Sequence, residues 1–217
     1  MKNFLNYEND LMSTIAKVAD SVTLGVLWLI CSLPVFTAGA ASAAFYFAFN
    51  RCIRQNSGYA WKTFFNAFKG NFKQATQIWL ILLGLIFMTL LDSYLVGSMK
   101  DVLSFAPVIL AAIIALLLIC LMWGLYLFAY LARFENPNKA VMKNSAVIML
   151  LNMPWSIMLL LLFAGAVACF LFAPLVSLFT PTLYMFLANK ILERIFRKYM
   201  TAEDLEKEAS YTHLDSP

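Results

Sequence analysis

The hydrophobic positions of this chain fall into long uncharged runs, which polar and basic segments separate. The first run extends from Ser21 to Asn50, and others cover 74–91, 102–132 and 144–189. About 20 apolar residues are enough to cross the hydrocarbon core of a bilayer as a helix. The runs are continuous rather than alternating, which favours helices over the strands of a membrane barrel. The pattern therefore predicts an all-α, polytopic transmembrane helical bundle.

The first run is interrupted at Pro34 and again at Thr37-Ala38-Gly39. Proline has no backbone N–H and clashes with the preceding turn, so one helix is predicted to end near Leu33. The Thr37 hydroxyl can cap a second helix that begins at Ala38. Two helices here give six crossings, which we favour because one straight helix of about 30 residues, about 45 Å long, would exceed the bilayer core. A single kinked crossing would give five.

Small residues occupy the first turns of the second helix, from Ala38 to Ala44. Small side chains let helix backbones approach closely in a membrane, so this helix is predicted to pack tightly.

A basic amphipathic helix is predicted after the second crossing, because aromatic residues recur at helical spacing and lysines lie on the other side. This pattern is typical of a helix that lies in the headgroup plane of the bilayer. The alternative is a docking element for a partner protein. The residues of this candidate interface are Trp61, Phe64, Phe65, Phe68, Lys69, Phe72 and Lys73.

The predicted helices form a transmembrane domain over residues 1–200, and a polar tail follows over 201–217. Pro174 marks the expected turn between the last two crossings, and Pro181 a kink within the last. The predicted helices are 9–33, 38–54, the interfacial helix 59–73, 75–98, 104–132, 143–173 with a break near Pro154, and 176–199.

Basic residues concentrate in the segments 51–73 and 133–143 and at the end of the last helix. An excess of Lys and Arg marks the cytoplasmic side of a membrane protein. We therefore predict that these three basic segments and the C-terminus are cytoplasmic. With six crossings, the N-terminus is cytoplasmic as well.

The composition argues against catalysis. The chain is 62% hydrophobic and 13% charged, and its one histidine, His213, lies in the polar tail. It has no phosphate-binding, dinucleotide-binding or HExxH motif, so we expect no enzyme activity, cofactor or metal. The net charge is +4, and the basic residues lie beside hydrophobic runs. In that position they set the orientation of the protein in the membrane and do not indicate nucleic-acid binding. The lipid bilayer is the expected environment.

The remaining polar and sulfur-bearing residues are expected to be structural. Acidic residues fall at the ends of the spans. Asp92 is the one candidate for an ionisable group buried in a transport pathway, and we favour a place at the outer interface for it. The four cysteines are expected to be small buried residues, because they lack CxxC spacing; they are Cys31, Cys52, Cys120 and Cys169. Polar residues within the uncharged runs are expected to form hydrogen bonds between helices. They are Ser42, Asn50, Asn152, Thr180, Thr182 and Asn189.

Two strings resemble the YesL family of small bacterial membrane proteins. They are CSLPVFTAGA at 31–40 and FFNAFKGNFK at 64–73, and NMPW at 152–155 resembles a later, less specific motif. The resemblance covers about residues 10–200. It implies a bacterial plasma-membrane protein encoded beside ABC importers for plant-derived oligosaccharides. It implies no catalytic residues, because the family has no established biochemical activity.

These observations lead to three hypotheses. The first is a non-catalytic accessory protein that associates with the permease subunits of a carbohydrate ABC importer. The alternative is a small independent transporter or channel, whose site would be the helix break at Pro34, Thr37 and Gly39, since free backbone groups at a broken helix can bind polar ligands. The third is a membrane-embedded sensor of sugar uptake.

Overall fold

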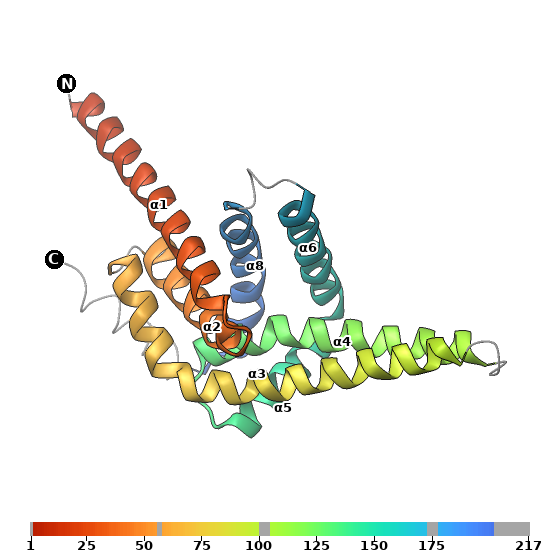
Figure 1. The fold of residues 1–217 in the computed structure, drawn as a ribbon. Coiled ribbons are helices and arrows are strands. Elements are labelled where there is room, and N and C mark those ends of the chain that lie inside the picture. The colour runs from red at the N-terminus through yellow and green to blue at the C-terminus, as the bar shows by residue number, and fades with distance from the viewer. Residues whose placement is uncertain (1, 56–57, 100–104, 173–177, 202–217) are drawn as a thin grey trace.

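The computed structural model describes residues 2–55, 58–99, 105–172 and 178–201. All the regular elements in these ranges are helices, which confirms the predicted all-α class (Figure 1). The elements are α1 (Lys2–Ser32), the 3-10 turn η1 (Val35–Thr37), α2 (Ala38–Ala48), the π-helix η2 (Phe49–Arg54), α3 (Ala60–Ser98), α4 (Ala106–Arg133), α5 (Asn138–Leu151), α6 (Met153–Phe172) and α8 (Thr180–Phe196).

Among the described residues, four helices are long and apolar enough to cross a membrane. They are Thr14–Ser32 within α1, together with α3, α4 and α6. Two other segments are shorter. The first consists of α2, with 11 residues, followed by η2, with 6, and the second is α8, with 17. Both are shorter than the roughly 20 residues of a typical span. The multi-pass membrane class is therefore supported, and the count of six crossings stays a prediction.

The chain reverses direction at the helix break. The Trp28 indole N–H on α1 donates to Ser42 Oγ on α2 at 3.1 Å, and the Trp28 ring lies 6.1 Å from the Phe45 ring. These contacts pair residues on opposite sides of the break, as in an antiparallel hairpin. Residues 21–50 therefore do not form a single kinked helix.

The predicted cap at Thr37 is wrong. The Thr37 hydroxyl lies 2.6 Å from the Cys31 carbonyl oxygen and 2.7 Å from that of Pro34, and it makes no capping bond to α2. The last carbonyls of a helix lack partners within the helix, and the hydroxyl provides one for the Cys31 carbonyl at the end of α1. The Trp79 indole N–H from α3 donates to the Val35 carbonyl at 2.6 Å and holds the turn from outside.

The small residues of α2 are buried between α1, α3 and α4, as predicted. Ala40, Ala41, Ala43 and Ala44 are completely inaccessible to solvent. A methyl group added at Gly39 would lie 2.5 Å from Trp79 Cβ and 2.8 Å from Phe128 Cε1. Only a glycine therefore lets α3 and α4 approach the start of α2 this closely.

The predicted helices 59–73 and 75–98 are one continuous helix, α3, of 39 residues. No proline interrupts this segment, so every backbone N–H can continue the helical ladder through Gly70. Figure 1 shows that α3 bends, so that its first part points in a different direction from the rest of the helix. The remainder pairs with α4 in a hairpin that projects beyond the other helices.

The prolines of the C-terminal half begin helices rather than kink them. The break predicted near Pro154 lies at Asn152, between α5 and α6, and Pro154 is in the first turn of α6. Pro181 is likewise in the first turn of α8, so the predicted kink there is wrong. A proline is tolerated in a first turn because its missing N–H would have no helical partner. The predicted turn at Pro174 and the tail beyond Thr201 lie outside the described residues.

Candidate functional site

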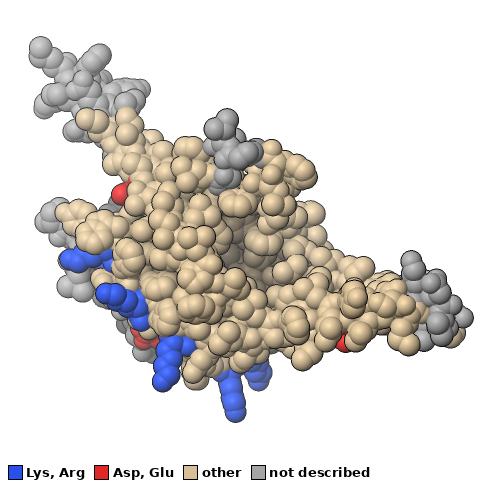
Figure 2. All heavy atoms as spheres, viewed as in Figure 1, with Lys and Arg blue, Asp and Glu red and all other residues tan. Residues whose placement is uncertain are grey.

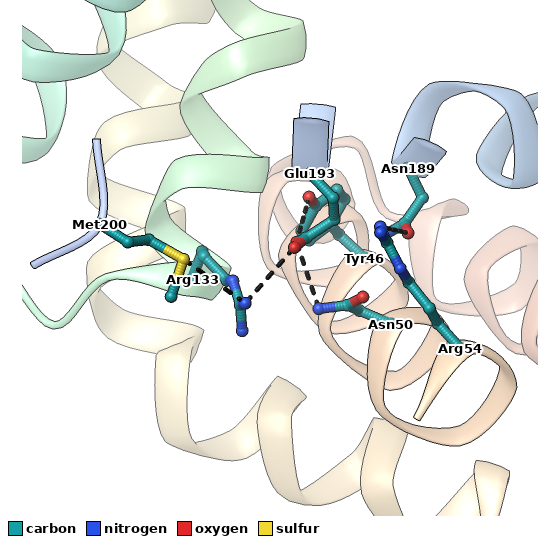
Figure 3. A network of polar contacts seen from close by, with 7 residues as sticks. All are labelled: Tyr46, Asn50, Arg54, Arg133, Asn189, Glu193 and Met200. Carbon is teal, nitrogen blue, oxygen red and sulfur yellow. Dashed lines mark hydrogen bonds and ion pairs between the residues drawn. The ribbon is translucent and has the colours of Figure 1, made fainter. Parts of the chain in front are cut away.

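A buried ion pair joins the ends of α4 and α8. Glu193 on α8 is only 1% exposed, and its Oε2 lies 3.4 Å from Nη2 of Arg133, the last residue of α4 (Figure 3). The Tyr46 hydroxyl donates to Glu193 Oε1 at 2.8 Å, and Asn50 Nδ2 donates to the same oxygen at 3.2 Å. A buried carboxylate is tolerated when its oxygens are paired in this way.

The same network continues on both sides of the ion pair. Arg133 Nη2 also lies 3.7 Å from the Met200 sulfur, and Arg54 Nη1 donates to Asn189 Oδ1 at 3.4 Å (Figure 3). We call the seven residues in Figure 3 the Glu193 cluster. Its members come from α2, η2, α4 and α8 and the segment that follows α8, so the cluster holds elements far apart in sequence together.

Two members of the cluster lie on the π-helix η2, namely Asn50 and Arg54. π-Helical turns are rare and occur often at functional sites, because the extra residue changes which side chains share a face. Tyr46 on the preceding α-helical turn and Asn50 on η2 reach the same carboxylate oxygen. The transition from α2 to the π-helix therefore places two hydrogen-bond donors next to the buried carboxylate.

A polar cavity of about 830 Å³ lies next to the cluster. Its described lining comes from the end of α2, η2, the first part of α3, the end of α4, the α4–α5 connection, α5 and the segment after α8. The lining thus includes parts of the three segments that the sequence predicts to be cytoplasmic, together with ends of predicted membrane helices. Figure 2 shows that Lys and Arg gather on one side of the molecule, at its lower left. The common side is consistent with the predicted orientation, which stays a prediction.

One wall of the polar cavity is braced by Tyr130 of α4. Its hydroxyl accepts hydrogen bonds from Asn136 Nδ2 at 3.1 Å and from Asn144 Nδ2 at 3.0 Å. Its ring stacks on Phe134 with 4.5 Å between centroids. The Asn136 carbonyl oxygen accepts a further bond from Gln74 Nε2 of α3 at 2.7 Å. These bonds fix the α4–α5 connection against α3 and α5.

The helix-break residues lie elsewhere. Pro34, Thr37 and Gly39 line neither the polar cavity nor a second, largely apolar cavity of about 300 Å³ between α1, α2, α4, α6 and α8. The polar groups of the break bond to one another and to Trp79, as described above. The structure therefore does not bring these three residues together with the Glu193 cluster.

The candidate interface helix is divided between core and surface. Phe64 is completely buried and its ring lies 6.2 Å from that of Phe68, whereas Trp61 is 59% exposed. The remaining predicted residues of the interface, Phe65, Lys69, Phe72 and Lys73, are exposed. Asn66 and Asn71 of the same helix segment line the polar cavity.

The polar residues expected to bond between helices do so, which confirms that prediction where contacts are described. Ser42 pairs with Trp28 and Asn50 with Glu193, as given above. Asn189 pairs with Arg54. Asn152 Nδ2 donates to the Tyr199 hydroxyl at 3.1 Å, and the Thr182 hydroxyl donates to the Ser21 carbonyl at 3.0 Å.

Glu193 is the functional candidate that sequence reasoning missed, because acidic residues were expected at the ends of the spans and not in the core. Its spacing carried a signal. The buried positions of α8 that recur every three or four residues are Met185, Ala188, Asn189, Leu192, Glu193 and Phe196. Glu193 thus lies on the apolar face. No local pattern could have identified Arg133 as its partner.

All four cysteines are free thiols, two buried and two partly buried. Within the described ranges no group of three or more His, Cys, Asp or Glu residues could hold a metal ion. The arrangement that the structure does provide is a charged, hydrogen-bonded wall beside a polar cavity.

One family model matches part of the chain. The model of this family, described as a protein of unknown function, DUF624, matches residues 22–93. The match covers the later part of α1, the helix break, α2, η2 and most of α3. No curated protein and no solved structure matches the chain.

Proposed function

We propose that this chain is a non-catalytic accessory protein of the bacterial plasma membrane that associates with the permease subunits of a carbohydrate ABC importer. The setting rests on the resemblance of residues 31–40 and 64–73 to the YesL family. The DUF624 domain includes both segments and is consistent with that resemblance.

The observation that carries the proposal is the outer part of the α3–α4 hairpin, residues 83–98 and 106–119, where few side chains are buried by the described part of the chain. Past Leu82, the buried side chain of α3 in the described range is Thr89, and α4 buries none between Ala106 and Cys120. The apolar side chains here are largely exposed, as at Phe87 and Val108. This surface suits the lipid bilayer or the helices of another membrane subunit.

Glycines on this surface favour a helical partner. A methyl group added at Gly84 or Gly97 would meet no atom within 4 Å, so the chain itself does not use the space beside them. Small residues at the surface of a membrane helix permit close approach of another helix. We therefore place the contact with a permease along the outer hairpin.

The test is co-purification of the tagged chain in a mild detergent, with the associated proteins identified by mass spectrometry. We expect permease subunits to be recovered, and Gly84→Leu to reduce that recovery. Gly165→Leu on α6 is the matched control, because that position is equally open. Recovery of the chain alone in the presence of overexpressed permeases would contradict the proposal, as would equal recovery with both variants.

Independent transport through the helix break has less support. The Thr37 hydroxyl and the Val35 carbonyl already have partners, and Gly39 is covered by Trp79 and Phe128. If the break were a transport site, the purified chain in liposomes would move a sugar or ion unaided. Thr37 substitutions would then abolish that flux.

A further inference from the structure

We infer that the polar cavity binds an uncharged molecule that carries several hydroxyl groups, a sugar or a polyol. The inference deepens the proposed function and rests on it for its biological setting. The binding itself is argued from the side chains of the cavity.

Three asparagines of the polar cavity are held by the protein through one Nδ2 hydrogen each, and their amide oxygens are acceptors. Asn136 and Asn144 donate Nδ2 to Tyr130, and Asn71 donates Nδ2 to the Ala67 carbonyl at 3.2 Å. An amide side chain has both a donor and an acceptor end. Within the described ranges no group donates to the Oδ1 atoms of these three lining residues, so they can accept from a bound molecule.

Hydrogen-bond donors face the same space from two phenols. The Tyr130 hydroxyl accepts two bonds and the Tyr199 hydroxyl accepts one from Asn152 at 3.1 Å. A phenol that acts only as an acceptor keeps its own proton to donate. No residue in the described part of the chain accepts either proton. Both tyrosines line the polar cavity and can donate to a ligand.

Charged residues of both signs line the polar cavity. Arg51, Arg133 and Glu135 line it, and Glu193 lies behind the wall in its ion pair with Arg133. Because Arg133 is already paired with Glu193, Arg51 and Glu135 are the other charged residues of the described lining, and they have opposite signs. A charged ligand would also have to compete with the existing ion pair at 3.4 Å.

A hydroxyl group both donates and accepts, so it matches a lining that offers both functions. The stacked rings of Tyr130 and Phe134 add an apolar wall, which suits the C–H face of a sugar ring. The volume of about 830 Å³ falls within the roughly 300–1,000 Å³ of small-molecule sites. The lining, charge and size of the polar cavity point to the same class of ligand.

The test is isothermal titration calorimetry on the purified full-length chain in detergent. The probes are maltose, cellobiose, raffinose and myo-inositol, with glucuronate and inorganic phosphate as anions. We expect saturable binding of at least one neutral probe and none of the anions. Absence of saturable binding for all four neutral probes would overturn the inference. Tighter binding of phosphate or glucuronate would also overturn it.

Variants locate the binding in the polar cavity. We expect Asn71→Ala and Tyr199→Phe each to weaken the binding by about threefold to tenfold, since each removes one hydrogen-bonding group. Both residues are at least partly exposed, so the fold should tolerate these changes. Asn138→Ala is the matched control, because Asn138 bonds to Gln77 outside the cavity. Unchanged binding in Asn71→Ala and Tyr199→Phe would overturn the placement.

The calorimetry and the co-purification test separate claims, so a negative result in one does not determine the result of the other. Calorimetry uses the chain without permeases, and co-purification uses no added sugar. Sugar binding without permease recovery would leave this inference standing and remove the proposed function. Permease recovery without sugar binding would do the reverse.

Discussion

Gly39 shows how one missing side chain sets the packing of three helices. It lies at the start of α2, where Trp79 of α3 and Phe128 of α4 cover it at distances that leave no room for a methyl group. Gly84 on α3 is also helical, yet its surroundings are open. Two glycines of the same chain therefore have different structural requirements.

We predict that Gly39→Ala lowers the free energy of unfolding by about 1–3 kcal/mol, because overpacking shifts α3 or α4. Gly84→Ala is the matched control and should leave stability unchanged or slightly raised, since alanine favours the helix. Thermal unfolding of the purified proteins in detergent measures both. Equal melting temperatures for the two variants would show that the contact at Gly39 is not tight.

The Arg133–Glu193 pair leads to a second prediction at the residue scale. Glu193→Met should cost about 3–5 kcal/mol, because it leaves a buried guanidinium without its carboxylate. The double variant with Arg133→Met should cost less than the sum of the two single changes. Lys190→Met, on the same helix but exposed, serves as the control. Additive losses in thermal or denaturant unfolding would argue against a coupled pair.

At the scale of elements, α3 combines two environments in one continuous helix. Its first part buries Phe64 against the core and leaves Trp61 exposed, whereas its second part exposes apolar side chains almost throughout. The bend seen in Figure 1 separates these parts. The aromatic side chains that remain exposed suit the headgroup region of a bilayer.

We predict that Trp61 lies at headgroup depth. In a variant that retains only this tryptophan, lipids brominated near the headgroup should quench its fluorescence more strongly than lipids brominated near the chain ends. Phe65→Ser combined with Phe72→Ser should reduce the quenching, because both exposed rings anchor the helix. Equal quenching by both lipids would contradict an interfacial position. Gln77→Ser, an exposed position on the same helix, is the control.

At the scale of the whole molecule, the structure brings three basic segments to one side. They meet around the polar cavity, although they are separated by long apolar helices in the sequence. The outer hairpin of α3 and α4 extends away from this side. This arrangement is consistent with a multi-pass membrane protein whose basic side faces the cytoplasm.

Cysteine labelling tests the orientation. In a background without the four native cysteines, Lys62→Cys and Lys139→Cys should react with a membrane-impermeant reagent only after the cells are permeabilised. Met99→Cys, at the end of the hairpin, should react in intact cells. All three positions are exposed, so accessibility reports sidedness. Labelling of position 62 or 139 from outside would reverse the predicted orientation.

The amino-acid sequence by itself determined the features that depend on local pattern. Uncharged runs identified the long apolar helices, Pro34 identified the break, and the alanines after Gly39 identified the tightly packed helix. Each of these follows from the chemistry of neighbouring residues, because a proline or an apolar run acts on its own segment. The periodicity of apolar residues in α8 also indicated that Glu193 lies on the buried face of this helix.

Only the tertiary structure decided which distant groups meet. It showed that the chain reverses at the break, that α3 continues through Gly70, and that Arg133 and Tyr46 surround Glu193. It also formed the polar cavity from segments more than a hundred residues apart in sequence. Periodicity reports which face of a helix is buried, but not which helix covers it. That choice depends on the packing of the whole chain.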